Sequence, residues 1–129
     1  MPYGNLLADV VQSSVTGTPP QFNDGSGTQT GTLCRAWVNF NGTGTVAIRA
    51  SFNVSSITDN GTGNYTVNFA TALSDANYSF SLTAGTISGN YLAATPYTNN
   101  PTTTQLQFNT VNFSSSNVDA LYVTVAVFR

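Results

Sequence analysis

The side chains that could carry acid–base chemistry are few and scattered. The sequence contains no histidine, lysine or glutamate, and charged residues make up only 6% of it. What remains is five acidic residues, all aspartate, three arginines and one cysteine. General acid–base catalysis requires a group that titrates near the working pH, most often histidine. The composition therefore predicts a binding or structural protein and not an enzyme.

The remaining reactive groups do not form a catalytic or metal-binding pattern. Asp24, Asp59, Asp75 and Asp119 all lie in turn-like contexts, where a carboxylate usually bonds to nearby backbone. Glycoside hydrolysis needs two neighbouring acids, and metal binding needs clustered ligands. We therefore expect no metal and no cofactor. Cys34 is the single cysteine and has no histidine to activate it, so it is expected to be a small buried hydrophobe.

Two Asn-Gly-Thr-Gly segments, at 41–44 and 60–63, are the glycine-rich motifs of the chain. Neither contains the lysine of a phosphate-binding loop, and no helical pattern follows them. Asn-Gly is a strong signal for a tight hairpin turn because both residues tolerate positive φ. Both segments are predicted to be hairpin turns.

One segment has the composition of a binding loop. Residues 85–101 are neutral and rich in asparagine, threonine and tyrosine, which provide flat contact area and adaptable hydrogen bonds. The candidate receptor-binding residues are Tyr91, Tyr97, Asn99 and Asn100. An alternative stays open, in which the two tyrosines pack over the end of the fold. Trp37 is expected to pack in the core or at an interface.

The elements that position these groups show a period of two. Ala36, Val38 and Phe40 alternate with polar residues, and residues 46–54 predict one strand with a single apolar face. A phase change predicts a bulge or bend near Asn109. No segment has a helical stripe, so six to eight strands predict an all-β fold. The expected architecture is an antiparallel β-sandwich, a jelly-roll-like knob over residues 33–129.

The final strand is apolar on both faces. Such a strand lies either at the centre of a sheet or against another subunit. We expect a symmetric oligomer with this strand near the contact. The candidate interface residues are Tyr122, Val123, Val125, Val127 and Phe128.

Residues 1–32 differ in composition from the rest of the chain. They are rich in serine, threonine and glycine and contain Pro19 and Pro20, which favour extended chain. We expect a linker, or an extended arm that orders against a partner. Its candidate anchor residues are Leu6, Leu7, Val10 and Val11.

The charge balance excludes two classes of partner. Three dispersed arginines and a net charge of −2 are too little basic character for a nucleic-acid footprint. The longest apolar stretches are far shorter than the roughly 20 residues of a membrane-spanning helix. We therefore expect neither nucleic-acid binding nor membrane insertion.

Several segments carry a resemblance to a known family. Residues 34–45, 48–63 and 65–69, together with 75–78 and 123–129, resemble a domain common in tailed bacteriophages. The similarity is greatest to structural and tail-fibre proteins of phages from aquatic bacteria. The resemblance implies a trimeric β-structure at a fibre tip or on the virion surface, with no catalytic residues. It implies a location in the virion, after assembly in the cytoplasm of the bacterial host.

The resemblance and the composition lead to one expected function and one alternative. The expectation is a short tail fibre or receptor-binding knob that attaches the phage to a host surface glycan or protein. Only about 30 residues precede the domain, where fibre proteins normally have a long shaft. A capsid decoration (cement) protein or head fibre is therefore the alternative. In both cases the arm would contact other virion proteins, of the tail, baseplate or capsid, and the knob would form a homotrimer.

Overall fold

A computed structural model describes residues 22–23, 28–29, 34–86, 91–96 and 101–129. Its described residues contain strands and no helix, and they confirm the all-β antiparallel sandwich expected from the sequence. The chain divides into two compact units, Met1–Leu33 and Cys34–Arg129. In the first unit, β1 (Phe22–Asn23) pairs antiparallel with β2 (Thr28–Gln29). The anchor candidates Leu6, Leu7, Val10 and Val11 lie outside the described residues.

The second unit is built from eight antiparallel strands. Their hydrogen-bonded order is β4-β3-β10-β7-β8-β9-β6-β5. β8 begins by pairing with β7 and continues by pairing with β9, so it joins two layers of strands. The bounds are β3 (Cys34–Asn41), β4 (Ala47–Phe52), β5 (Val54–Asp59), β6 (Asn64–Phe69), β7 (Ser79–Gly85), β8 (Tyr91–Pro96), β9 (Gln105–Val111) and β10 (Tyr122–Phe128).

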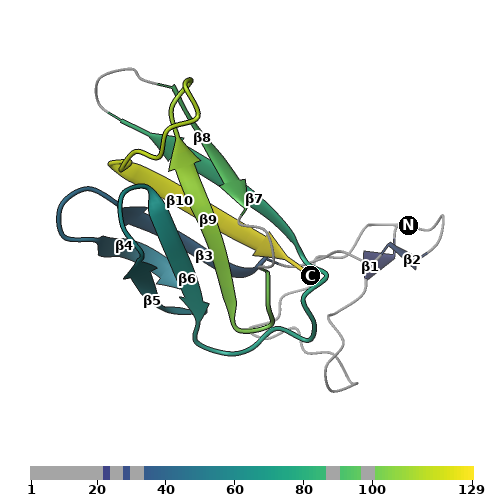
Figure 1. The fold of residues 1–129 in the computed structure, drawn as a ribbon. Coiled ribbons are helices and arrows are strands. Elements are labelled where there is room, and N and C mark those ends of the chain that lie inside the picture. The colour runs from purple at the N-terminus through teal and green to yellow at the C-terminus, as the bar shows by residue number, and fades with distance from the viewer. Residues whose placement is uncertain (1–21, 24–27, 30–33, 87–90, 97–100) are drawn as a thin grey trace, which may run out of the picture. The chain divides into compact units, whose positions relative to one another are not determined.

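The core lies between the layer β4-β3-β10-β7 and the layer β8-β9-β6-β5 (Figure 1). Aromatic rings fill its centre. Phe40 meets Tyr65 edge to face, with 5.3 Å between ring centroids, and Phe108 packs against both. The buried apolar residues come from both layers: Ala36, Val38, Phe40, Tyr65, Val67, Phe69, Leu73, Tyr78, Leu106, Phe108, Ala120, Val123, Val125 and Val127.

The single strand predicted over residues 46–54 is two strands. Asn53 has a φ of 53°, in the left-handed region, and ends β4 where β5 begins. Within β4, a register shift leaves Arg49 without a partner on β3. Such a bulge turns the following side chains to the other face. Phe52 is therefore paired with Trp37 on the outside, and the predicted apolar row of one face does not exist.

The phase change near Asn109 has a different cause from the predicted one. β9 runs without a register shift from Gln105 to Val111, and its inward residues Leu106, Phe108 and Thr110 are fully buried. Phe113 lies beyond the end of the strand, in the loop that leads to β10. The prediction of a bulge at Asn109 was wrong because a strand and a loop were read as one element.

Both predicted hairpin turns are confirmed. The first joins β3 to β4, where Gly44 has a φ of 62° and the Asn41 side chain bonds to Thr43. The second joins β5 to β6, with Gly61 and Gly63 at φ values of 115° and 62°. Glycine adopts all three values without strain, and the φ of 115° is open to glycine alone, so the two motifs determine where the chain reverses.

β10 occupies the centre of its layer, between β3 and β7. Val123, Val125 and Val127 point into the chain's own core and are at most 2% exposed. The expectation that these three valines contact another subunit is therefore corrected, since the fold already covers them. Tyr122 and Phe128 lie on the opposite face of the strand and are exposed.

The predicted loop at 85–101 contains a strand. Tyr91 is the first residue of β8 and pairs with Gly85 of β7. Tyr97, Asn99 and Asn100 lie outside the described residues. The pattern was misread because Tyr91 to Pro96 has little apolar alternation, while hydrogen bonds to both neighbouring strands hold it in the sheet.

Candidate functional site

The two outer faces of the sandwich have different chemistry. One is carried by β4, β3, β10 and β7, and its exposed large side chains are aromatic. We call it the aromatic face. Cross-strand pairs place its members together, because directly opposed residues share a face. Its members are Trp37, Phe52, Tyr122 and Phe128, with the smaller side chains Asn39, Ala50, Ser81, Thr83, Thr124 and Ala126 between them.

A row of paired residues crosses the aromatic face. Phe52 is opposite Trp37, Trp37 is opposite Ala126, and Ala126 is opposite Ser81. Trp37 is 40% exposed and Phe52 is 55% exposed, although both are large apolar side chains. Phe128 lies two residues from Ala126 on the same face of β10 and is also exposed. These three aromatic side chains thus come from neighbouring strands at one end of the face.

Tyr122 at the other end of the face is held by Arg49. The guanidinium carbon lies 4.8 Å from the centre of the tyrosine ring, within the range of a cation–π contact. Arg49 also donates hydrogen bonds to Asn39 Oδ1, at 3.2 Å, and to the backbone oxygen of Leu121, at 2.7 Å. The extra residue of the bulge in β4 is Arg49, and its side chain thus extends across β3 and reaches β10.

The opposite outer face, on β5, β6 and β9, is neutral and polar. We call it the amide face. Carboxamides and hydroxyls alternate with the buried core residues along each strand. The amide face consists of Ser56, Thr58, Asn60, Asn64, Thr66, Asn68, Gln105, Gln107 and Asn109.

Side-chain hydrogen bonds connect much of the amide face. Asn64 Oδ1 accepts from Gln107 Nε2 at 2.9 Å and from Asn60 Nδ2 at 3.2 Å. The Asn60 amide also donates to Thr66 Oγ1 at 2.9 Å, and the Thr66 side chain is buried. Bonds of this kind restrict the side-chain rotamers, so the face presents an ordered array of donors and acceptors.

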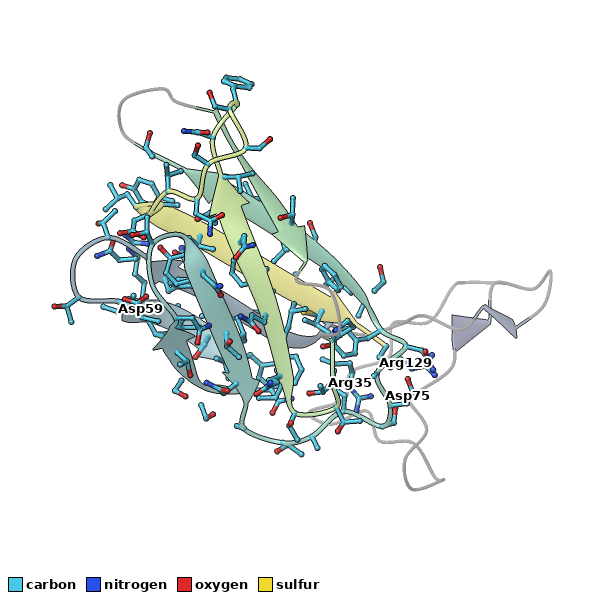
Figure 2. The ribbon with its side chains drawn as sticks, in the orientation of Figure 1. Arg35, Asp59, Asp75 and Arg129 are labelled. Carbon is cyan, nitrogen blue, oxygen red and sulfur yellow. The ribbon has the colours of Figure 1, made fainter. Side chains whose placement is uncertain are left out.

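The charged residues of the second unit are dispersed. Asp59 lies at one end of the sandwich, far from the ion pair between Asp75 and Arg129 at the other end (Figure 2). Arg129 hydrogen-bonds to Asp75 and holds the pKa of its carboxyl below the usual value. Within the described ranges, no three histidine, cysteine or acidic side chains gather in a way that could bind a metal ion.

The structure brings together only part of the predicted site. Tyr122 and Phe128 share one exposed face, but Trp37 and Phe52 of that face were not among the predicted interface residues. Trp37 could have been found, because it is out of phase with the buried row Ala36, Val38 and Phe40. Phe52 could not have been found from the sequence, because the bulge at Arg49 turns its side chain to the outer face. Cys34, expected to be buried, is half-buried, and its thiol donates to the Ala36 carbonyl.

Comparisons with known proteins add no family. No protein-family model, curated protein or solved structure matches the chain. A helix suited to crossing a membrane is likewise not found in the described part of the chain.

Proposed function

We propose that this chain is a bacteriophage virion structural protein, a short tail fibre or receptor-binding knob that attaches the phage to its host. The amide face is the observation that carries this proposal, because it is a rigid, neutral surface of hydrogen-bonding groups on a β-sandwich. The resemblance of residues 34–45, 48–63 and 65–69 to a domain of phage structural and tail-fibre proteins supports the same role.

The chemistry of the amide face suits a neutral host-surface glycan. A sugar hydroxyl both donates and accepts hydrogen bonds, and so does a carboxamide. Asn64, Asn68 and Gln107 are held by their neighbours, so little rotamer freedom is lost when a ligand binds. Binding without charged groups should change little with salt concentration.

The role in the virion is tested by electron microscopy of intact particles that carry a tag after Arg129. Label on the tail or baseplate is the expected result. Label over the head shell would favour the alternative, a capsid decoration protein, and would overturn the attachment role. Particles without label, in preparations where the tagged protein is expressed, would overturn the assignment to the virion.

The attachment surface is tested with purified protein and host cells. The double substitution Asn64→Ala and Gln107→Ala removes the centre of the amide face, and we expect about tenfold weaker binding. Thr71→Ala with Ser74→Ala, at two exposed positions between β6 and β7, is the matched control and should bind like the wild type. Tyr91→Ala with Tyr97→Ala tests the tyrosine segment in the same assay. Loss of binding in that variant alone would move the receptor site from the amide face to residues 91–97.

A further inference from the structure

The aromatic face exposes four large apolar side chains to water. Trp37, Phe52, Tyr122 and Phe128 are 40%, 55%, 51% and 37% exposed. With roughly 200 Å² for a fully exposed aromatic side chain, these fractions correspond to about 370 Å². The largest apolar patch on a monomer is roughly 300–600 Å² and is often functional. A patch of this size requires an explanation.

We propose that the aromatic face is the contact surface between copies of this chain. A standard protein–protein contact covers roughly 800 Å² on each partner. The four aromatic side chains supply nearly half of this area. Small side chains of β3, β4, β7 and β10 lie between them and supply further area without obstructing close approach.

The composition of the face suits a contact between copies. Its strands contain no carboxylate and two arginines. Arg49 is already bound by Asn39, Leu121 and the ring of Tyr122, and Arg35 is half-buried. A symmetric contact uses the same patch on both subunits. Aromatic residues and arginine, with few other charges, also form the usual composition of interface centres.

The strand arrangement indicates a face-to-face contact. β4 is the open edge of its layer, but the bulge at Arg49 interrupts its regular hydrogen-bonding edge. Bulges of this kind disfavour edge-to-edge pairing of strands. β10 lies at the centre of the layer, and the valines on its inner side are fixed in the core. The layer is therefore held in place by the core. Two such layers packed face to face would lie about 10 Å apart.

This inference does not depend on a role in phage attachment, and it is tested on the full-length protein in solution. Sedimentation equilibrium gives the mass, and so the number of copies. Trp37 is the single tryptophan of the chain and lies within the proposed contact, so its fluorescence reports on that surface directly. We expect a mass of two copies, because a contact that uses the same patch on both subunits is complete with one pair. On dilution, tryptophan emission should shift to longer wavelength as the complex dissociates.

Two variants and one control locate the contact. Phe52→Asp and Phe128→Asp each place a charge on an exposed position of the aromatic face, and we expect the dissociation constant to rise about thirtyfold or more. Thr58→Asp adds the same charge to the exposed part of the amide face and should leave association unchanged. Urea unfolding identifies any variant that fails to fold. If one aspartate variant does not fold, the association of the other one tests whether the aromatic face is the contact.

Two results would overturn the proposal. The first is a wild-type mass of one chain at all concentrations up to about 1 mM, with unchanged Trp37 emission. The second is an oligomer that persists in both folded aspartate variants and whose dissociation leaves the emission of Trp37 unchanged. The second result would move the contact to another part of the chain.

Discussion

The hydroxyl oxygen of Tyr65 lies 3.0 Å from Asp119 Oδ1, although the two residues are 54 positions apart. The same hydroxyl lies 2.8 Å from the backbone oxygen of Gly42, so its single proton is shared between two acceptors. Asp119 Oδ1 also accepts a bond from Gly63 N at 2.7 Å. Asp119 thus ties both hairpin turns to the segment that leads into the central strand β10.

The first prediction concerns this junction between Tyr65 and Asp119. Asp119→Ala leaves the buried Gly63 N–H without its acceptor, and we expect a loss of about 1–2 kcal/mol in the free energy of unfolding. Tyr65→Phe should cost about 1 kcal/mol. Because both substitutions remove the same contact, the double variant should lose less than the sum, by at least about 0.5 kcal/mol. Urea denaturation of the four proteins measures this, and additive losses would show that the two side chains do not act together.

The second prediction concerns the glycines that face this junction. A Cβ atom on Gly42 would lie 2.6 Å from the Tyr65 hydroxyl oxygen and 2.8 Å from the Ala120 carbonyl oxygen. A Cβ atom on Gly63 would lie 2.6 Å from two backbone atoms, at a φ of 62°. We expect Gly42→Ala and Gly63→Ala each to reduce the free energy of unfolding by about 2 kcal/mol.

Gly85 provides the matched control for these glycine substitutions. It lies at the end of β7, and a Cβ atom there would meet nothing within 4 Å. Gly85→Ala should therefore change stability by less than about 0.5 kcal/mol. Thermal or urea unfolding compares the three variants, and equal effects at Gly42, Gly63 and Gly85 would contradict the close packing around the junction.

The third prediction is a loss of stability at alkaline pH. Burial raises the pKa of Tyr78 from 10.0 to about 12. Burial, followed by the hydrogen bond to Asp119, also raises the pKa of Tyr65. Between pH 10 and 12 the unfolded chain loses phenolic protons that the folded chain keeps. Stability is therefore complete below about pH 10 and falls as the pH rises toward 12, by up to about 1.4 kcal/mol per pH unit for each such tyrosine.

Tyr78→Phe tests the assignment of this alkaline effect. The variant also loses the bond from the hydroxyl to the Gln105 carbonyl, so it starts with lower stability at pH 8. Its free energy of unfolding should nevertheless fall less steeply between pH 10 and 12 than that of the wild type. Full recovery after return to pH 8 controls for chemical damage. Parallel curves for the two proteins would show that Tyr78 does not cause the decline.

Local chemistry made part of this fold predictable. The Asn-Gly-Thr-Gly segments at 41–44 and 60–63 predicted both turns because asparagine and glycine accept the positive φ that a tight reversal needs. Alternation predicted the buried row Ala36, Val38 and Phe40 because side chains of a strand point to opposite faces in turn. For the same reason, the absence of a helical stripe was sufficient to predict the all-β class.

The candidate site was less predictable because it depends on which strands become neighbours. The sequence alone showed that β10 is apolar on both sides, but not that β3 and β7 would enclose it and bury Val123, Val125 and Val127. Phe52 reached the outer face only through the bulge at Arg49, which forms where β4 pairs with β3.

The sequence by itself thus determined the class of fold, the two hairpin turns and the absence of histidine, lysine and glutamate, since these depend on residue type and on period-two spacing. The tertiary structure decided that one outer face is aromatic, that the other is amide-rich, and that Tyr65 meets Asp119. These properties arise from pairings between residues distant in the chain. A one-residue shift in register moves every later side chain to the other face, and the composition of the strand does not record that shift.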